Sequence, residues 1–384
     1  MSAEHCMAHG SFLSTFTPYI VREVNHDSQH VPCCGRGAFP FLRAEILVDW
    51  QVMAMKLGML GMWATHANGI VRQVADHPKE FSLVGFYDPD PQVIEERRKQ
   101  WEPKIGRFRV FDSPERLLRE PLDGVVVEGQ VYGNLKLARL AVEKGLPVLL
   151  EKPAGTDLEE YRRLIELAHR KHLPVQLLYL FRYMSAVVEM ISRARKGEFG
   201  VIYEFRARLP KPLDSYQHFV DMLRPYKGGI FFEMAGHVID MMVALLGPPK
   251  AISPFLAHHH TEPPATYIDN GVAIYTYPNA WGIIEVPALE VVPQSRRIEV
   301  YGTKGAFAIP HLGTGHLPIG DIQPIEVYRT GDADWKRIDL PASTLQITDL
   351  REFAACVSGK KQPNYTIEHD YKVQETLLRT CAMV

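Results

Sequence analysis

Short apolar runs alternate with helical stretches between Lys56 and Leu178, and this alternation restricts the fold of the 384-residue chain more than any other feature. The runs have the length of buried strands, and the stretches between them place apolar residues at helical spacing. Alternating strands and helices form parallel sheets with right-handed crossovers. The sequence therefore predicts an α/β fold whose N-terminal part is a Rossmann-like, doubly wound parallel sheet. The expected strands are 56–60, 81–87, 107–111, 124–127, 147–150 and 175–178.

The second half of the chain has a different pattern. After a helix at 186–196, runs with a period of two indicate strands in a mostly antiparallel open sheet. These runs are 201–208, 271–277, 281–286, 296–301 and 306–310, and two helices are expected at 348–357 and 369–383. We therefore expect a dinucleotide-binding domain at 53–176 and an α+β domain for substrate binding and oligomerisation at 177–384.

Residues 1–52 lack clean periodicity and are predicted to be a poorly ordered extension. Two histidine-containing groups were considered as metal sites: His26, His30, Cys33 and Cys34 in this extension, and the run His258–His260. Neither has the spacing of a standard zinc site. No metal is expected.

The overall composition favours small-molecule chemistry. A net charge of −2 gives no electrostatic reason to expect a nucleic acid or an acidic membrane as partner. The chain has no run of 18 uncharged apolar residues. Its five cysteines do not form a disulfide framework. This usage of cysteine predicts a reducing, cytoplasmic location.

The segment Gly145–Gly155 contains the first chemical motif, Glu151-Lys152-Pro153. The proline restricts the residue before it to an extended conformation, so Lys152 is expected at the carboxyl end of a strand. Ligands of open α/β sheets bind at that end. The alternative is that Glu151 and Lys152 are solvated charges at a strand end.

A loop that could bind a dinucleotide follows the first strand. Such loops place glycine at the first, third and sixth positions, but here only Gly61 is a glycine, and Trp63 and His66 occupy the other two. Asp88 follows the second strand, where a carboxylate binds the adenosine ribose hydroxyls and disfavours a 2′-phosphate. NAD is therefore expected rather than NADP. The alternative is that Asp88 is only a turn residue before Pro89.

The second chemical motif is Gly228–Asp240. In a helix that starts after Gly229, Glu233, His237 and Asp240 would share one face. Ionisable groups in an otherwise apolar helix must be paired or must face a cavity. A histidine satisfied within the core is the alternative.

These motifs together resemble the Gfo/Idh/MocA oxidoreductase family. The shared order is the loop at Gly61, the acid at Asp88, Glu151-Lys152-Pro153, and Tyr179-Leu180-Phe181-Arg182 after the last strand. The resemblance implies that Lys152 lies beside the nicotinamide and the substrate. It also implies that Glu233 and His237 face substrate hydroxyls, although the family commonly has aspartate in place of Glu233.

Asn134 stands where the family often has a histidine. Lys211, Tyr216 and His218 are further candidates for the substrate cleft. Predicted substrate contacts are Tyr179, Arg182 and Asp240. The alternatives are that Tyr179 is a core residue and that Asp240 orients the neighbours of His237 on the helix without contacting substrate. The predicted cofactor contacts are Gly61, Met62, Trp63, Thr65, His66, Asp88, Glu128, Gln130, Glu151 and Lys152.

The sequence thus predicts an NAD-dependent oxidoreductase that oxidises a sugar, cyclitol or related polyol. Lys152 would bind the reacting oxygen, His237 would be the general base or acid, and Glu233 would orient His237 or bind a neighbouring hydroxyl. The resemblance implies a homodimer or homotetramer formed through the second sheet. Two alternatives remain: an NAD-dependent glycoside hydrolase or lyase with transient redox chemistry, and a non-catalytic nucleotide-binding regulator.

Overall fold

A computed structural model describes residues 54–212, 220, 223–260, 267–290, 295–313 and 321–384. They belong to one compact unit, Gln51–Val384. The predictions for residues 1–52, and those for Tyr216 and His218, lie outside the described residues. Within the described ranges, no helix combines the length and the apolar character needed to cross a membrane.

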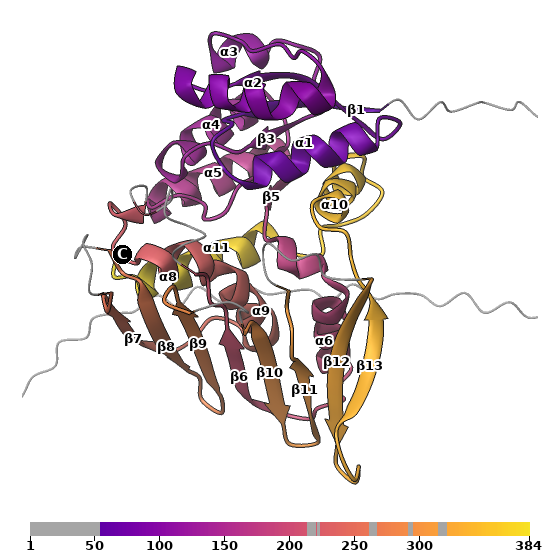
Figure 1. The fold of residues 1–384 in the computed structure, drawn as a ribbon, viewed down its shortest axis with the longest axis vertical. Coiled ribbons are helices and arrows are strands. Elements are labelled where there is room, and N and C mark those ends of the chain that lie inside the picture. The colour runs from indigo at the N-terminus through magenta and orange to yellow at the C-terminus, as the bar shows by residue number, and fades with distance from the viewer. Residues whose placement is uncertain (1–53, 213–219, 221–222, 261–266, 291–294, 314–320) are drawn as a thin grey trace, which may run out of the picture. The chain divides into compact units, whose positions relative to one another are not determined.

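The N-terminal half is built on a five-stranded sheet in the order β2-β1-β3-β4-β5, with all neighbours parallel. Every residue of β3 and β4 is buried, as expected for central strands covered by helices on both faces. The predicted Rossmann-like parallel sheet is confirmed (Figure 1). The strands are β1 (Met55–Leu60), β2 (Phe81–Tyr87), β3 (Gly124–Val127), β4 (Val148–Leu150) and β5 (Val175–Leu177), and the helices are α1 (His66–Asp76), α2 (Pro91–Ile105), α3 (Pro114–Leu117), α4 (Val131–Glu143) and α5 (Leu158–Lys171).

The prediction of a strand at 107–111 is wrong. This segment makes only an isolated bridge between Val110 and Phe86, beyond the edge strand β2. Two backbone hydrogen bonds, from Phe86 N to Arg109 O and from Phe111 N to Phe86 O, join the segment to β2. The segment therefore borders the sheet without extending it.

The C-terminal half contains an eight-stranded sheet in the order β13-β12-β11-β10-β6-β9-β8-β7, in which only β6 and β9 pair in parallel. The predicted, mostly antiparallel sheet is confirmed. Three strands were not predicted, namely β7, β12 and β13, and β7 shows why: most of its residues are exposed and it contains Pro254, so it lacks alternation. The strands are β6 (Ile202–Arg208), β7 (Ala251–Ala257), β8 (Asn270–Thr276), β9 (Trp281–Pro287), β10 (Arg297–Gly302), β11 (Gly305–Ile309), β12 (Ile322–Arg329) and β13 (Lys336–Pro341).

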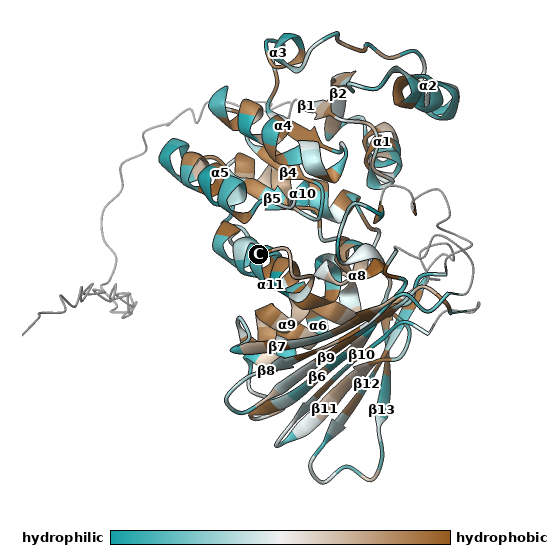
Figure 2. Cartoon of the chain, turned by 90° about the vertical axis from the view of Figure 1, so that its left-hand side faces the viewer, coloured by the Kyte–Doolittle hydropathy of each residue, from teal (hydrophilic) through white to brown (hydrophobic). Residues whose placement is uncertain are grey.

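Helices cover one face of this second sheet, as Figure 2 shows for α6, α8 and α9. Helix α9 is almost entirely apolar and buried, so it forms the centre of the layer between the two sheets. The helical elements of this half are η1 (Leu180–Tyr183), α6 (Ser185–Arg195), α8 (Gly229–Met234), α9 (Gly236–Leu246), α10 (Ile347–Val357) and α11 (Ile367–Thr380).

The last two helices return to the first sheet. On α10, Arg351 makes a paired contact with Glu80, with nitrogen–oxygen distances of 2.8 and 2.7 Å. On α11, the Gln374 amide accepts from Ala154 N at 3.1 Å and donates to Gly155 O at 2.7 Å. The C-terminal helices therefore hold the loop that follows Glu151-Lys152-Pro153, a contact that no local sequence pattern indicated.

Candidate active site

Lys152 connects the two halves of the protein at the carboxyl end of β4. Its Nζ atom donates to Glu233 Oε1 at 2.7 Å and to Glu233 O at 3.0 Å, and Glu233 lies on α8. Lys152 is 3% exposed and Glu151 is 5% exposed. Their burial excludes the alternative of solvated strand-end charges.

The segment that carries Glu233 and His237 is two helices, so the single helix expected after Gly229 is wrong. Helices α8 and α9 meet at Ala235. Gly229 has φ +48°, and a Cβ atom there would lie 2.3 Å from Ile268 O, so glycine is required where α8 starts. At Gly236, a Cβ atom would lie 2.8 Å from the Tyr179 hydroxyl. The bare backbone at Gly236 therefore lets Tyr179 pack beside His237.

His237 is held in a buried aromatic environment. Its ring stacks on Phe181 at a centroid distance of 4.5 Å. The rings of Tyr179 and His66 are in edge-to-face arrangements with it, at centroid distances of 5.6 and 6.3 Å. Burial, followed by the charge of Lys152, holds the pKa of His237 well below its usual range. The ring is therefore neutral near pH 7 and can accept a proton.

The loop after β1 is fixed by close backbone packing. Gly61 has φ +84°, and a Cβ atom there would lie 2.2 Å from Gly129 N in the loop after β3. Met62 N donates to Asp88 Oδ2 at 2.6 Å, and Asp90 N donates to Asp88 Oδ1 at 2.9 Å. Burial raises the pKa of Asp88. Gly61 and Asp88 thus occupy the positions that the dinucleotide fingerprint assigns to them.

Arg97, on α2, is a buried residue that the sequence analysis did not name. Its guanidinium donates to Met62 O at 2.6 Å, to Trp63 O at 2.7 Å and to Ala64 O at 3.3 Å. Arg97 therefore fixes the loop after β1 by hydrogen bonds to three of its carbonyl oxygens. The signal was present as an i, i+4 stripe, because the buried residues of α2 are Val93, Arg97 and Trp101.

The loop after β3 brings a third acidic residue to this edge. Glu128 is fully buried, and neither carboxylate oxygen has a hydrogen-bond partner within the described part of the chain. Burial, followed by the charge of Glu151, raises the pKa of Glu128 well above its usual range. A protonated Glu128 would present a hydroxyl. Gln130 is half-buried directly before α4, and Thr65 is exposed directly before α1.

His66 bonds to Glu151 rather than lying free at the loop. Its Nδ1 atom is 2.9 Å from Glu151 Oε2. The imidazole at the sixth loop position therefore connects α1 to the segment that contains Lys152. In the C-terminal half, burial lowers the pKa of Lys211, while the charge of Glu233 opposes the shift.

Arg182 and Asp240 form a buried ion-pair cluster behind His237. Arg182 Nε and Nη2 donate to Asp240 at 2.9 and 2.7 Å, and Nη2 also pairs with Asp370. His369 Nε2 lies 2.7 Å from Asp240 Oδ1. Burial alone would raise the pKa of Asp240, but Arg182 and His369 outweigh it and leave that pKa below its usual range.

This cluster bears on two predictions. Three predicted substrate contacts are at most 1% exposed, namely Tyr179, Arg182 and Asp240. The contacts that they make in the structure are with other residues of the protein, and their contacts with substrate stay predictions. Asp240, His369 and Asp370 also form the one three-residue group in the described ranges with the proximity of metal ligands. Because the Arg182 guanidinium bonds to both carboxylates, it supplies the positive charge that a metal would bring.

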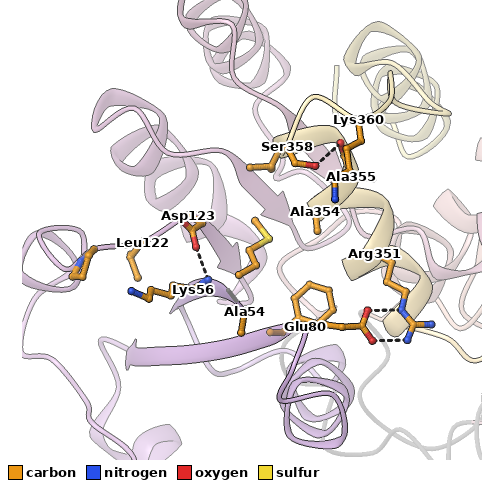
Figure 3. Close-up of a pocket in the computed structure, with 14 residues that line it drawn as sticks. Ala54, Lys56, Glu80, Leu122, Asp123, Arg351, Ala354, Ala355, Ser358 and Lys360 are labelled. Atoms are coloured by element: carbon orange, nitrogen blue, oxygen red, sulfur yellow. Dashed lines mark hydrogen bonds and ion pairs between the residues drawn. The ribbon is translucent and has the colours of Figure 1, made fainter. Parts of the chain in front are cut away.

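The opposite edge of the first sheet has a cavity of about 650 Å³ between the starts of β1 and β2 and helix α10. Figure 3 shows Ala54 and Leu122 at its wall and the Glu80–Arg351 pair at one side. Ligands of open α/β sheets bind at the carboxyl ends of the strands. The cavity therefore lies at the wrong edge to serve the residues around Lys152.

A doubly wound parallel sheet, an open sheet beside it, and ionisable side chains where they meet define a Rossmann-fold oxidoreductase. Comparison with known families agrees. Residues 55–179 match the family described as "Oxidoreductase family, NAD-binding Rossmann fold", and residues 187–308 match the "GFO/IDH/MocA C-terminal domain". The chain belongs to the GFO/IDH/MocA family.

Similar proteins include dehydrogenases. The chain is 24% identical to "Myo-inositol 2-dehydrogenase" of Thermotoga maritima over 223 residues, which are 56% of this chain and 64% of that protein. It is 26% identical to "Uncharacterized oxidoreductase YdgJ" of Escherichia coli over 202 residues, 52% of this chain and 57% of that protein. The matches thus span less than two thirds of either relative.

Solved structures share the fold at low identity. "UDP-N-acetylglucosamine 3-dehydrogenase GnnA" from Acidithiobacillus ferrooxidans has a TM-score of 0.70 at 18% identity, covering 86% of this chain and 98% of that one. The "WlbA dehydrogenase from Bordetella pertussis in complex with NADH and UDP-GlcNAcA" has a TM-score of 0.67 at 19% identity, covering 86% and 97%.

The residues at the carboxyl edge fit a dinucleotide. Gly61, which packs on Gly129 too closely for a side chain, stands at the first glycine position of the dinucleotide fingerprint. The Glu128 carboxyl group is buried without a partner among the described residues. A buried polar group of this kind indicates a ligand or a bound water. Trp63 and His66 are the departures from the usual loop.

Proposed function

We propose that this protein is an NAD-dependent oxidoreductase that oxidises a CH–OH group of a sugar, cyclitol or related polyol. The observation that carries the proposal is the Lys152–Glu233 pair. It joins the two family motifs, one from each half of the protein, at the carboxyl edge of the parallel sheet. His237 lies beside this pair with its pKa lowered by burial and by Lys152.

A nicotinamide cofactor held at this edge would supply the hydride acceptor, and the side chains handle the alcohol oxygen and its proton. Lys152 hydrogen-bonds the oxygen and stabilises the negative charge that develops on it. His237, neutral before the reaction, accepts the proton. Glu233 fixes the Lys152 ammonium and binds a neighbouring hydroxyl. Low exposure of all three keeps water from competing for these contacts.

NAD is the proposed cofactor because Asp88 lies at the end of β2. Its carboxylate is fixed by Met62 N and Asp90 N, and it retains lone pairs for ribose hydroxyls. A 2′-phosphate in the same place would be repelled. Polyol substrates are supported by the similar proteins, which include an inositol dehydrogenase and a sugar-nucleotide dehydrogenase.

A homo-oligomer is also proposed, formed through the face of the second sheet that the helices leave open. Three exposed apolar side chains on that face are Phe255, Trp281 and Ile322, which are 64, 58 and 53% exposed. They lie on β7, β9 and β12, which are not neighbours in the sheet, so the interface would extend across the whole face. Size-exclusion chromatography of the Trp281→Glu variant tests this, and an unchanged elution volume would contradict it. The cytoplasmic location stays a prediction.

The experiment for the proposed activity has two stages. Calorimetric titration with NAD, NADH, NADP and NADPH measures whether the loop binds a dinucleotide and which one. A panel of sugars, cyclitols and glycosides is then incubated with the favoured cofactor, and both reduced cofactor and cleaved glycoside are quantified.

The outcomes separate the alternatives. Stoichiometric reduction of the cofactor with a polyol supports the proposal. Glycoside cleavage without net cofactor reduction would replace it by the hydrolase or lyase function. Absence of binding to all four dinucleotides would reject an NAD-dependent activity and favour a regulatory protein whose cofactor site is degenerate.

A further inference from the structure

His66 occupies a position where the dinucleotide loop would have glycine, and its side chain enters the candidate active site. It is the first residue of α1, and its Nδ1 atom lies 2.9 Å from Glu151 Oε2. The side chains of His66 and Glu151 are 19% and 7% exposed. A role as a cofactor contact, as predicted for His66, does not explain its bond to Glu151.

The bond to Glu151 fixes which nitrogen can take a proton. An ionised carboxylate only accepts hydrogen bonds, so the Nδ1 atom of His66 must carry the hydrogen. The Nε2 atom of neutral His66 is then the one with a free lone pair. When Nε2 is protonated, Glu151 provides the counter-charge.

His237 is the neighbour that has a proton to give. The two imidazole rings are 6.3 Å apart between centroids and nearly perpendicular, at 70°. At this centroid separation, the proton would pass between the two rings through one intervening water molecule. His237 is 4% exposed, whereas the His66 side chain is 19% exposed, so His66 is the more open of the two to solvent.

A proton left on His237 would be unfavourable. The ring is buried beside the Lys152 ammonium, and burial followed by Lys152 lowers its pKa. Glu151, the nearest carboxylate to His66, does not bond to His237 in any described contact. A charge on His66 is therefore better compensated than one on His237.

We propose that His66, oriented by Glu151, is a proton-relay residue that takes the substrate proton from His237 and passes it to solvent. The relay rests on the proposed oxidation. The alcohol loses a hydride to the cofactor and a proton to His237, whose Nε2 or Nδ1 atom then transfers that proton through water to His66 Nε2. His66 releases it to bulk water or buffer, so both histidines end each turnover as they began.

The test compares His66→Gln with His77→Gln in the full-length protein. His77 follows the other end of α1, and its ring bonds only to Gln73 O of the same helix, at 2.9 Å, so it controls for loss of a histidine from α1. Steady-state kcat is measured with and without added imidazole. Affinity for NAD is measured by calorimetry in the absence of substrate.

We expect kcat of the His66→Gln variant to fall about tenfold or more, a smaller loss than for a direct general base. Added imidazole should restore most of it, because a small diffusible base can replace a relay. NAD affinity should stay within about threefold of the unsubstituted protein, and His77→Gln should have normal kinetics. If His66→Gln does not fold, Glu151→Gln is used, and it should lower kcat with the same rescue.

Other outcomes overturn the relay. A His66→Gln variant as active as His77→Gln would reject it. Loss of NAD affinity without imidazole rescue would reject it too and would make His66 a cofactor contact. An unsubstituted protein that binds NAD but oxidises no polyol would reject the proposed function itself and the relay with it, which separates the two failures.

Discussion

The Nζ atom of Lys152 lies 2.7 Å from Oε1 of Glu233, and this contact joins the end of β4 in one sheet to helix α8 beside the other. The two residues are 81 positions apart. Lys152 has a side-chain exposure of 2% and Glu233 of 14%, so the pair is shielded from water. Electrostatic interactions are stronger in such a place than at the surface.

The first prediction concerns Lys152. The Lys152→Met variant keeps the length of the side chain but removes the ammonium group that would bind the reacting oxygen. We expect kcat for polyol oxidation to fall by about 10²- to 10⁴-fold. Lys136→Met on the exposed side of α4 is the control and should be fully active. A Lys152→Met variant with near-normal kcat would remove this residue from the chemistry.

The second prediction concerns Arg182. It bonds to both Asp240 and Asp370, and its removal would leave two buried carboxylates without their cation. We expect Arg182→Leu to lower the free energy of unfolding by about 3–5 kcal/mol. Urea denaturation measures the change. Arg162→Leu on exposed α5 is the control and should leave the midpoint unchanged, since exposed ion pairs contribute little. Equal midpoints for the two variants would contradict the structural role.

The ion pairs of Arg182 also show what the sequence could not predict. Local periodicity predicted the parallel sheet correctly because each strand and helix carries its own apolar pattern. Arg182 and Asp370 are 188 residues apart, and no local pattern relates them. The packing of α10 and α11 against the first sheet could not be predicted from the sequence for the same reason.

The candidate site likewise contains residues that a local motif predicts and residues whose contacts depend on the tertiary structure. Lys152, Glu233 and His237 were predicted because each lies in a short motif whose residue types suggest chemistry. Asp240 belongs to the same motif, but the break between α8 and α9 and the position of Arg182 decide its partners. Arg97 was overlooked because one buried arginine in a charged helix resembles its solvated neighbours.

The third prediction concerns cofactor choice. In the Asp88→Ser variant, the carboxylate that would bind the ribose hydroxyls and repel a 2′-phosphate is absent. We expect the ratio of NADP to NAD affinity to rise about tenfold or more, because one repelling charge is removed from a partly buried site. Calorimetry with both cofactors measures this ratio. Asp90→Ser, which removes a carboxylate two residues away but keeps a residue able to cap α2, should leave the ratio unchanged. An unchanged ratio in Asp88→Ser would mean that the carboxylate does not select the cofactor.

The fourth prediction concerns Asp349 in the first turn of α10. This carboxyl group is fully buried, and burial raises its pKa from 3.8 to about 7. The folded state therefore holds the proton more tightly than the unfolded state does. The stability from this group is fully present below about pH 4 and is lost as the pH rises to about 7.

Asp349→Asn removes this dependence, because the amide stays neutral at every pH. Between pH 4 and pH 8, the unsubstituted protein should lose about 3–4 kcal/mol of unfolding free energy that the variant keeps. Urea denaturation at several pH values measures the difference, and Asp76→Asn at the exposed end of α1 is the control. The unfolding free energies of the two proteins should be similar at low pH. Above pH 7 the Asp349→Asn variant should be the more stable. Parallel curves would show that Asp349 is ionised in the folded protein across this range.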